Sequence, residues 1–85
     1  MSKNFNPYLQ SAILEVVENQ LAGNDPPETK KTYERLVQDG HSEVDAKKLI
    51  GCVVAAEMFF VMKQGKPFDH ARFVAALDRL PQIPE

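Results

Sequence analysis

Cysteine is nearly absent from this 85-residue chain, in which Cys52 is the single example. One cysteine excludes an intramolecular disulfide framework, so the fold is not a disulfide-stabilised secreted scaffold. Cys52 lies in an apolar segment, where an uncharged thiol behaves as a small hydrophobic side chain. A reactive thiol is the alternative interpretation, but no histidine lies near Cys52 in sequence.

The chain also lacks an excess of charge of one sign and a long apolar run. Ten Lys and Arg stand against twelve Asp and Glu, with the two signs interspersed, so no basic stripe is available for a phosphate backbone. The apolar segment 52–62 is too short to span a bilayer and contains Glu57. The start of the chain, MSKNFNPYLQ, has no apolar signal core. These features predict a soluble cytoplasmic protein of bacterial type that does not enter a membrane.

Strand-length alternation of apolar and polar residues is missing, whereas signals for helix ends are frequent. Helix starts are predicted from an N-cap before proline at Asn6–Pro7, from caps at Asp25 and Ser42, and from a cap at Asp69. Gly23, Gly40, Gly65 and Pro81 are the predicted stops. The sequence therefore predicts a single all-α domain over 1–85, a compact bundle of four helices at about 6–22, 26–39, 42–64 and 69–80. Short mobile ends are expected at 1–5 and 81–85.

The second predicted helix has a narrow apolar edge at Tyr33, Leu36 and Val37, which Thr29 can extend. Its other side chains are predicted to form a solvated face: Glu28, Lys30, Lys31, Glu34, Arg35 and Gln38. The third helix is different, because its second half is apolar nearly all round. Such a helix must be wrapped by other elements or by a partner chain. We therefore expect a homodimer in which Met58, Phe59 and Met62 lie in an oligomer interface or an exposed apolar patch.

Glu57 is the one charge in the segment GCVVAAEMFFVM, and its helical neighbours cannot neutralise it. A buried carboxylate without a partner would be protonated or strongly destabilising. Three interpretations are open. Glu57 can meet water or a basic residue of another helix, make a polar contact inside a homodimer, or serve as a site carboxylate. The basic candidates are Arg72, Arg79 and Lys30.

A metal site or a metal-dependent enzyme is the first alternative function, with Glu15, Glu18 and Glu57 as candidate polar site. It requires these carboxylates to converge. His41 and His70 lack partners at metal-binding spacing, so we interpret them as exposed residues at helix ends and predict no metal, cofactor or catalytic residue. A nucleic-acid-associated regulator is the second alternative. It requires one basic patch made of Lys30, Lys31, Lys47 and Lys48.

From Asn6 to about Leu80 the chain resembles a family of small bacterial helical proteins of unknown function. The resemblance rests on the Asn-Pro start, the Gln-Leu end of the first helix, the Pro-Pro start of the second and a glutamate in the long helix. It implies histidine pairs on the first and third helices. Here those positions are replaced by Gln10, Leu14, Val44 and Lys48. The resemblance supplies no activity, and we predict an interaction or assembly module rather than an enzyme.

Overall fold

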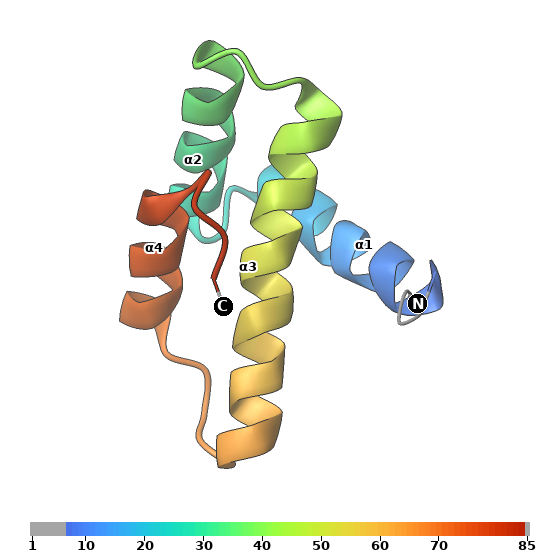
Figure 1. The fold of residues 1–85 in the computed structure, drawn as a ribbon, viewed down its shortest axis with the longest axis vertical. Helices are drawn as coiled ribbons and strands as arrows, with labels where there is room; N and C mark the ends of the chain where they lie inside the picture. Colours follow the sequence, from blue (N-terminus) through green and yellow to red (C-terminus); the bar gives the residue numbers. More distant parts are fainter. Residues whose placement is uncertain (1–6, 85) are drawn as a thin grey trace.

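The computed structural model describes residues 7–84, which form four α-helices (Figure 1). They are α1 (Pro7–Gly23), α2 (Pro27–Gln38), α3 (Glu43–Gln64) and α4 (His70–Arg79). The described residues contain no strand, and the prediction of a four-helix all-α fold is confirmed. The predicted cap at Asn6 and the predicted mobile end at 1–5 lie outside the described residues. Residues 81–84 follow α4 without further helix.

Local capping explains where α3 and α4 begin. The Ser42 side chain accepts a hydrogen bond from the Asp45 backbone N–H at 3.0 Å, and Asp69 accepts one from the Arg72 N–H at 3.1 Å. Each bond satisfies one of the free N–H groups in the first turn of its helix. At the other end of α3, Gly65 adopts a left-handed backbone conformation with φ of 66°, which ends the helix as predicted.

The connection between α1 and α2 differs from the prediction in two ways. The helix α1 includes Gly23, and the left-handed residue is Asn24 with φ of 52°. Asparagine tolerates this conformation because its short side chain is compatible with positive φ. The N-cap of α2 is Pro26 rather than Asp25, and Pro26 offers no side-chain acceptor. The predicted cap at Asp25 is therefore wrong by one residue, because the helix starts at the second proline of the pair.

The core lies where α2, α3 and α4 meet, with one residue of α1 completing it. Its fully buried side chains come from all four helices and the residue after α4: Val17, Leu36, Ala46, Ile50, Val53, Phe73, Leu77 and Leu80. Thr29 of α2 is also buried, as the predicted extension of the apolar edge requires, and its hydroxyl donates to Gln20 Oε1 at 3.0 Å. This bond satisfies a buried polar group and joins α2 to α1.

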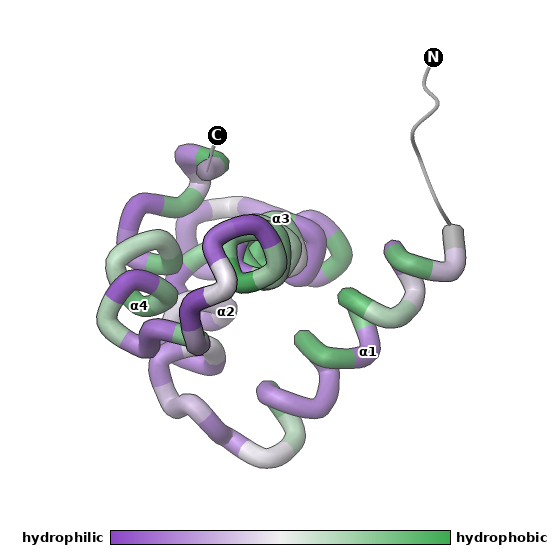
Figure 2. The backbone as a smooth tube through the Cα atoms, turned by 90° about the horizontal axis from the view of Figure 1, so that it is seen from below, coloured by the Kyte–Doolittle hydropathy of each residue, from purple (hydrophilic) through white to green (hydrophobic). Residues whose placement is uncertain are grey.

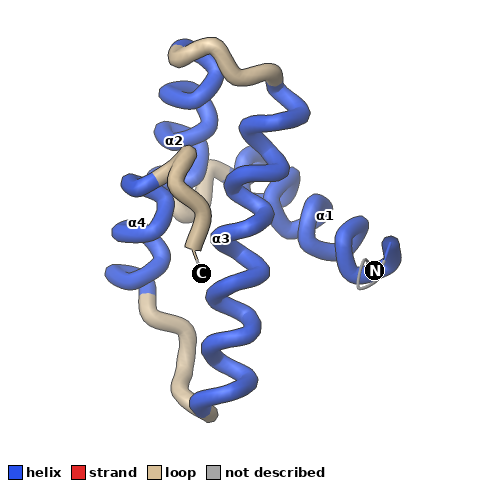
Figure 3. Tube along the Cα trace, viewed as in Figure 1, coloured by secondary structure: helices blue, strands red, loops and turns tan. Residues whose placement is uncertain are grey.

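The first helix crosses α3 instead of lying alongside it, as Figure 3 shows. The crossing is close because Gly51 of α3 has no side chain, and a Cβ at that position would lie 3.3 Å from Ile13 Cγ2. Beyond the crossing, the N-terminal part of α1 stands apart from the cluster of the other three helices (Figure 2). Within residues 7–84, α1 packs against α2 and α3 but does not contact α4. This arrangement leaves the second half of α3 only partly covered on the side of α1.

Candidate functional site

The second half of α3 presents a row of exposed apolar side chains. Met58, Phe59 and Met62 are 41%, 61% and 75% exposed, although each is a large hydrophobic residue. Together with Ala55 they follow the i, i+3, i+4, i+7 spacing of one helix face. The first helix covers these side chains only in part: Leu9 and Ile13 of α1 line a hollow beside them but leave them partly exposed. Their assignment to an interface stays a prediction.

A small hollow lies on one side of this row, between α1 and α3. It has a volume of about 120 Å³, and its lining is apolar. Its lining residues are Leu9 and Ile13 of α1 and Ala55, Met58, Phe59 and Met62 of α3. Ala55 has the smallest side chain of the six, which explains why the packing leaves a space here.

A larger groove of about 370 Å³ lies on the other side of Met58 and Met62. Val16 of α1 lines one side, and Phe68 of the α3–α4 connection lines another. Phe68 is 54% exposed, but its ring packs against the buried ring of Phe73, with 5.6 Å between the two ring centroids. Hollow and groove share Met58 and Met62, so they form one continuous surface. We call it the apolar face, defined by the partly exposed side chains Leu9, Val16, Met58, Phe59, Met62 and Phe68.

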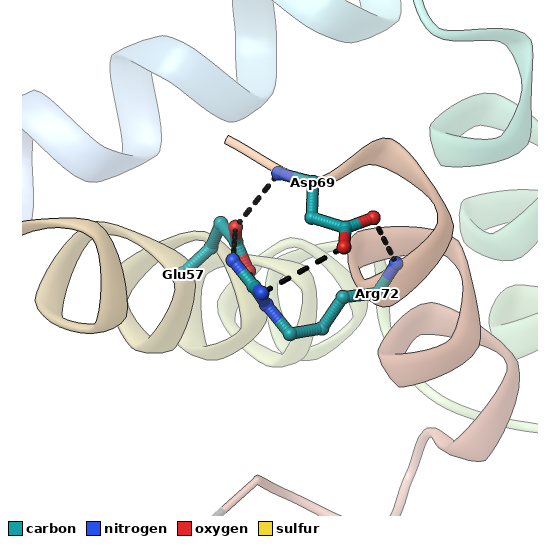
Figure 4. Close-up of polar contacts among 3 residues, drawn as sticks. All are labelled: Glu57, Asp69 and Arg72. Carbon is teal, nitrogen blue, oxygen red and sulfur yellow. Dashed lines mark hydrogen bonds and ion pairs between the residues drawn. The ribbon is translucent and has the colours of Figure 1, made fainter. Parts of the chain in front are cut away.

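Glu57 also lines the groove, but its charge is neutralised from within the chain (Figure 4). The side chain is 9% exposed, and its carboxylate accepts two hydrogen bonds from Arg72 of α4, one of them from Nε at 2.9 Å and one from Nη2. The backbone N–H of Asp69 donates a third bond at 3.2 Å. These bonds favour the charged carboxylate, so the Arg72 guanidinium lowers the pKa of Glu57 even though burial opposes the change. In the same way, Glu57 raises the pKa of Arg72.

The guanidinium of Arg72 is held from two further directions. Its central carbon lies 3.7 Å from the centroid of the Phe60 ring, and Nη1 lies 3.8 Å from Asp69 Oδ2. A guanidinium stacks well on an aromatic face because it is planar and weakly hydrated. The first predicted interpretation of Glu57, a basic partner on another helix, is therefore confirmed, with Arg72 as that partner. The pair fixes the start of α4 against α3 and with it the position of Phe68.

The other predicted site carboxylates have different surroundings. Glu18 accepts a 2.9 Å bond from Lys47 Nζ, which raises the pKa of Lys47, and Glu15 is exposed. No group of three or more His, Cys, Asp or Glu side chains suited to a metal ion occurs among residues 7–84. His70 Nε2 lies 3.7 Å from Glu28 Oε2, in a contact between the exposed His70 of α4 and the half-buried Glu28 of α2. Within residues 7–84 the carboxylates of Glu15, Glu18 and Glu57 do not come together as a metal site would require.

The lysines of the nucleic-acid alternative are only partly gathered. Lys30 and Lys47 line one hollow between α1, α2 and α3, but Glu18 and Glu34 line it as well. Lys31 lies at a different hollow, beside Glu34 and Glu43. The acidic neighbours offset the positive charge that a phosphate backbone would need.

Sequence reasoning missed one polar contact that positions α4. Arg35 was predicted to lie on a solvated face, but its guanidinium donates to the carbonyl oxygens of Leu80 at 3.0 Å and Leu77 at 3.1 Å. Both carbonyls lie at the C-terminal end of α4, where backbone donors become scarce, although the Leu77 carbonyl also accepts from the Leu80 N–H at 3.1 Å. The residues lie 45 and 42 positions from Arg35, so no local pattern signals the contact.

A family model described as a domain of unknown function, DUF1841, matches residues 1–79. The chain belongs to the DUF1841 family. This membership confirms the predicted resemblance to a small helical family of unknown function. No curated protein and no solved structure matches the chain. None of the DUF1841 helices within residues 7–84 is long and apolar enough to cross a membrane.

Proposed function

We propose that this DUF1841 protein is an assembly module that forms a homodimer through the apolar face. The observation that carries the proposal is the exposure of six large apolar side chains on one continuous surface of a small domain. Monomeric soluble proteins rarely expose contiguous apolar patches larger than a few hundred Å². A second copy of the chain is the occupant we propose, because the surface suits one in area and charge.

The area of the apolar face is suited to a dimer. If a large side chain presents about 200 Å² when fully exposed, the exposed fractions of the six residues correspond to roughly 600 Å² per copy. A standard interface buries about 800 Å² per partner, part of it in a polar rim. The apolar face therefore supplies most of the contact area that a stable dimer needs.

The charge of the surface supports the same proposal. Covering an unpaired carboxylate would cost several kcal/mol, which would oppose a dimer at the groove. Among the described residues 7–84, Glu57 is the only ionisable side chain that lines the groove, and its partner Arg72 comes from the same copy. The second copy therefore meets a surface whose charge is already compensated.

Light scattering over a range of concentrations tests the proposal. We expect a dimer for the native chain and a shift to monomer for Phe59→Glu, because a carboxylate at the centre of the apolar face would be buried without a partner. A hot-spot residue is worth about 2 kcal/mol or more, so the dimer dissociation constant should rise at least about 30-fold.

Val44→Glu is the matched control, since Val44 is an apolar residue at the other end of α3 and is 60% exposed. It should leave the mass unchanged. A native chain that is monomeric at every concentration would overturn the proposal and leave the apolar face to a different protein partner. Equal effects of Phe59→Glu and Val44→Glu would overturn it as well.

A further inference from the structure

We infer that Phe59 of each copy inserts into the hollow beside Ala55 of the other copy, so that neither hollow is complete without the second chain. The inference rests on the proposed dimer and specifies which side chains make its centre. Phe59 is 61% exposed on a regular part of α3, where the helix holds its side chain pointing outward. Aromatic side chains that fill a pocket on the partner are the typical hot spots of interfaces.

The size of the hollow agrees with a phenyl ring. Its volume is about 120 Å³, and it is lined by Leu, Ile, Ala and Met side chains and by Phe59 of the same copy. An apolar protein cavity of about 150 Å³ with a similar lining is able to bind benzene. The hollow opens to the surface, so a ring attached to a neighbouring chain can enter it without a change in the fold.

Symmetry explains why knob and hollow lie next to each other on one helix. In a two-fold dimer the same patch occurs on both sides, so a knob that contacts a hollow is matched by the reverse contact. Ala55 and Phe59 are four residues apart, which is about 6 Å along a helix. If two antiparallel copies of α3 cross near these residues, Phe59 of each copy lies opposite Ala55 of the other copy. Met58 and Met62 border the hollow, and their flexible side chains can adjust around the inserted ring.

A size exchange between two variants tests the insertion. Ala55→Leu fills the hollow, and Phe59→Ala removes the knob and, with it, one of the side chains that line the variant's own hollow. Each homodimer should then be at least about tenfold weaker than the native one, because one has two blocked hollows and the other has two empty ones. A mixture of the two variants should prefer the heterodimer. In it, Phe59 of the Ala55→Leu copy enters the open hollow of the Phe59→Ala copy. The filled hollow of the Ala55→Leu copy then faces only the small side chain at position 59 of the other copy.

Native mass spectrometry separates the three dimers, because the two variants differ in mass. An excess of heterodimer over the statistical mixture supports the insertion. Random pairing of the two variants overturns the insertion. If Phe59 and the hollow contact each other only within one chain, neither variant has a reason to prefer the other as its partner. Circular dichroism checks that each variant folds, and Ala55→Val serves as a smaller filling if Ala55→Leu does not fold.

Failure of the insertion and failure of the dimer give different results. If Phe59→Glu dissociates the dimer but the size exchange shows no preference, the apolar face is the interface and the insertion is wrong. If the native chain is monomeric at every concentration, both proposals are wrong. A native dimer that Ala55→Leu leaves unchanged also overturns the insertion.

Discussion

The two terminal helices of the described chain are attached to the fold in opposite ways. The helix α4 has 10 residues, yet it buries Phe73 and Leu77 and is bound by arginine contacts near both ends. The helix α1 has 17 residues, and among residues 8–23, whose burial the structure describes, Val17 is the one fully buried side chain. Helix length alone therefore does not decide how firmly a helix is integrated. The short helix is bound by buried side chains and arginine contacts, whereas the long one keeps apolar side chains such as Leu9 and Val16 partly exposed.

Removing a buried side chain from each helix should give the largest contrast. Phe73→Ala deletes a ring that is 2% exposed, and such changes typically lower the free energy of unfolding by about 3–5 kcal/mol. Val17→Ala removes only two methyl groups from α1 and should cost about 2 kcal/mol, at roughly 0.8 kcal/mol per buried methyl or methylene group plus a small cavity. Urea unfolding followed by circular dichroism measures both. Equal losses would mean that α1 is as firmly integrated as α4.

The next prediction concerns the polar contact at the start of α4. Glu57→Gln keeps the shape of the side chain but removes the charge that Arg72 and the Asp69 N–H bind. We expect the free energy of unfolding to fall by about 1–2 kcal/mol, as for the loss of charged hydrogen bonds at a buried acceptor.

Glu18→Gln is the matched control for this change. Glu18 is also paired with a basic residue, Lys47, but its side chain is 57% exposed. Exposed pairs contribute little, so its unfolding midpoint should stay close to that of the native chain. A larger effect of Glu18→Gln than of Glu57→Gln in urea unfolding would contradict the role assigned to the Glu57–Arg72 pair.

The stability provided by Glu57 should depend on pH in one direction. Its pKa in the folded chain is lowered from an ordinary value of 4.5, so the folded state favours the charged form. The difference in unfolding free energy between native chain and Glu57→Gln should therefore be full above pH 4.5 and shrink as the pH falls through the lowered folded pKa. Urea unfolding at several pH values measures this difference. A difference that grows on acidification would show that Glu57 is not charged in the fold.

The smallest effect is expected at the end of α4. Arg35→Met keeps most of the apolar stem of the side chain but removes both donors to the carbonyls of Leu77 and Leu80. Since Arg35 is 39% exposed, water can replace part of each bond, and the cost should be about 1 kcal/mol. Hydrogen exchange should show faster opening of α4 than of α3 in this variant. Unchanged exchange in α4 would mean that Arg35 does not hold this end of the helix.

The helices and most of their ends were predictable because their signals are local. Ser42, Gly65 and Asp69 act on backbone groups within four residues, so their roles follow from sequence alone. The start of α2 was displaced by one residue because Asp25 and Pro26 are both plausible at that boundary.

Contacts between residues far apart in the sequence were harder to predict. Arg72 was one of three basic candidates for Glu57, and only the packing of α4 on α3 decides between them. The contact of Arg35 with the end of α4 was not predicted, because it joins residues more than 40 positions apart. The exposure of Met58, Phe59 and Met62 depends on where α1 crosses α3, which helical periodicity does not specify.

The close crossing at Gly51 has a consequence for sequence variation among relatives. A side chain at position 51 would press against Ile13, whose Cγ2 atom would lie 3.3 Å from the new Cβ. Relatives that carry a residue larger than glycine at position 51 should carry a residue smaller than isoleucine at position 13, so that the two positions vary together. Where both positions are large, α1 must rotate or shift, and the hollow beside Ala55 would change shape. The residues at positions 13 and 51 therefore predict which relatives have the same apolar face.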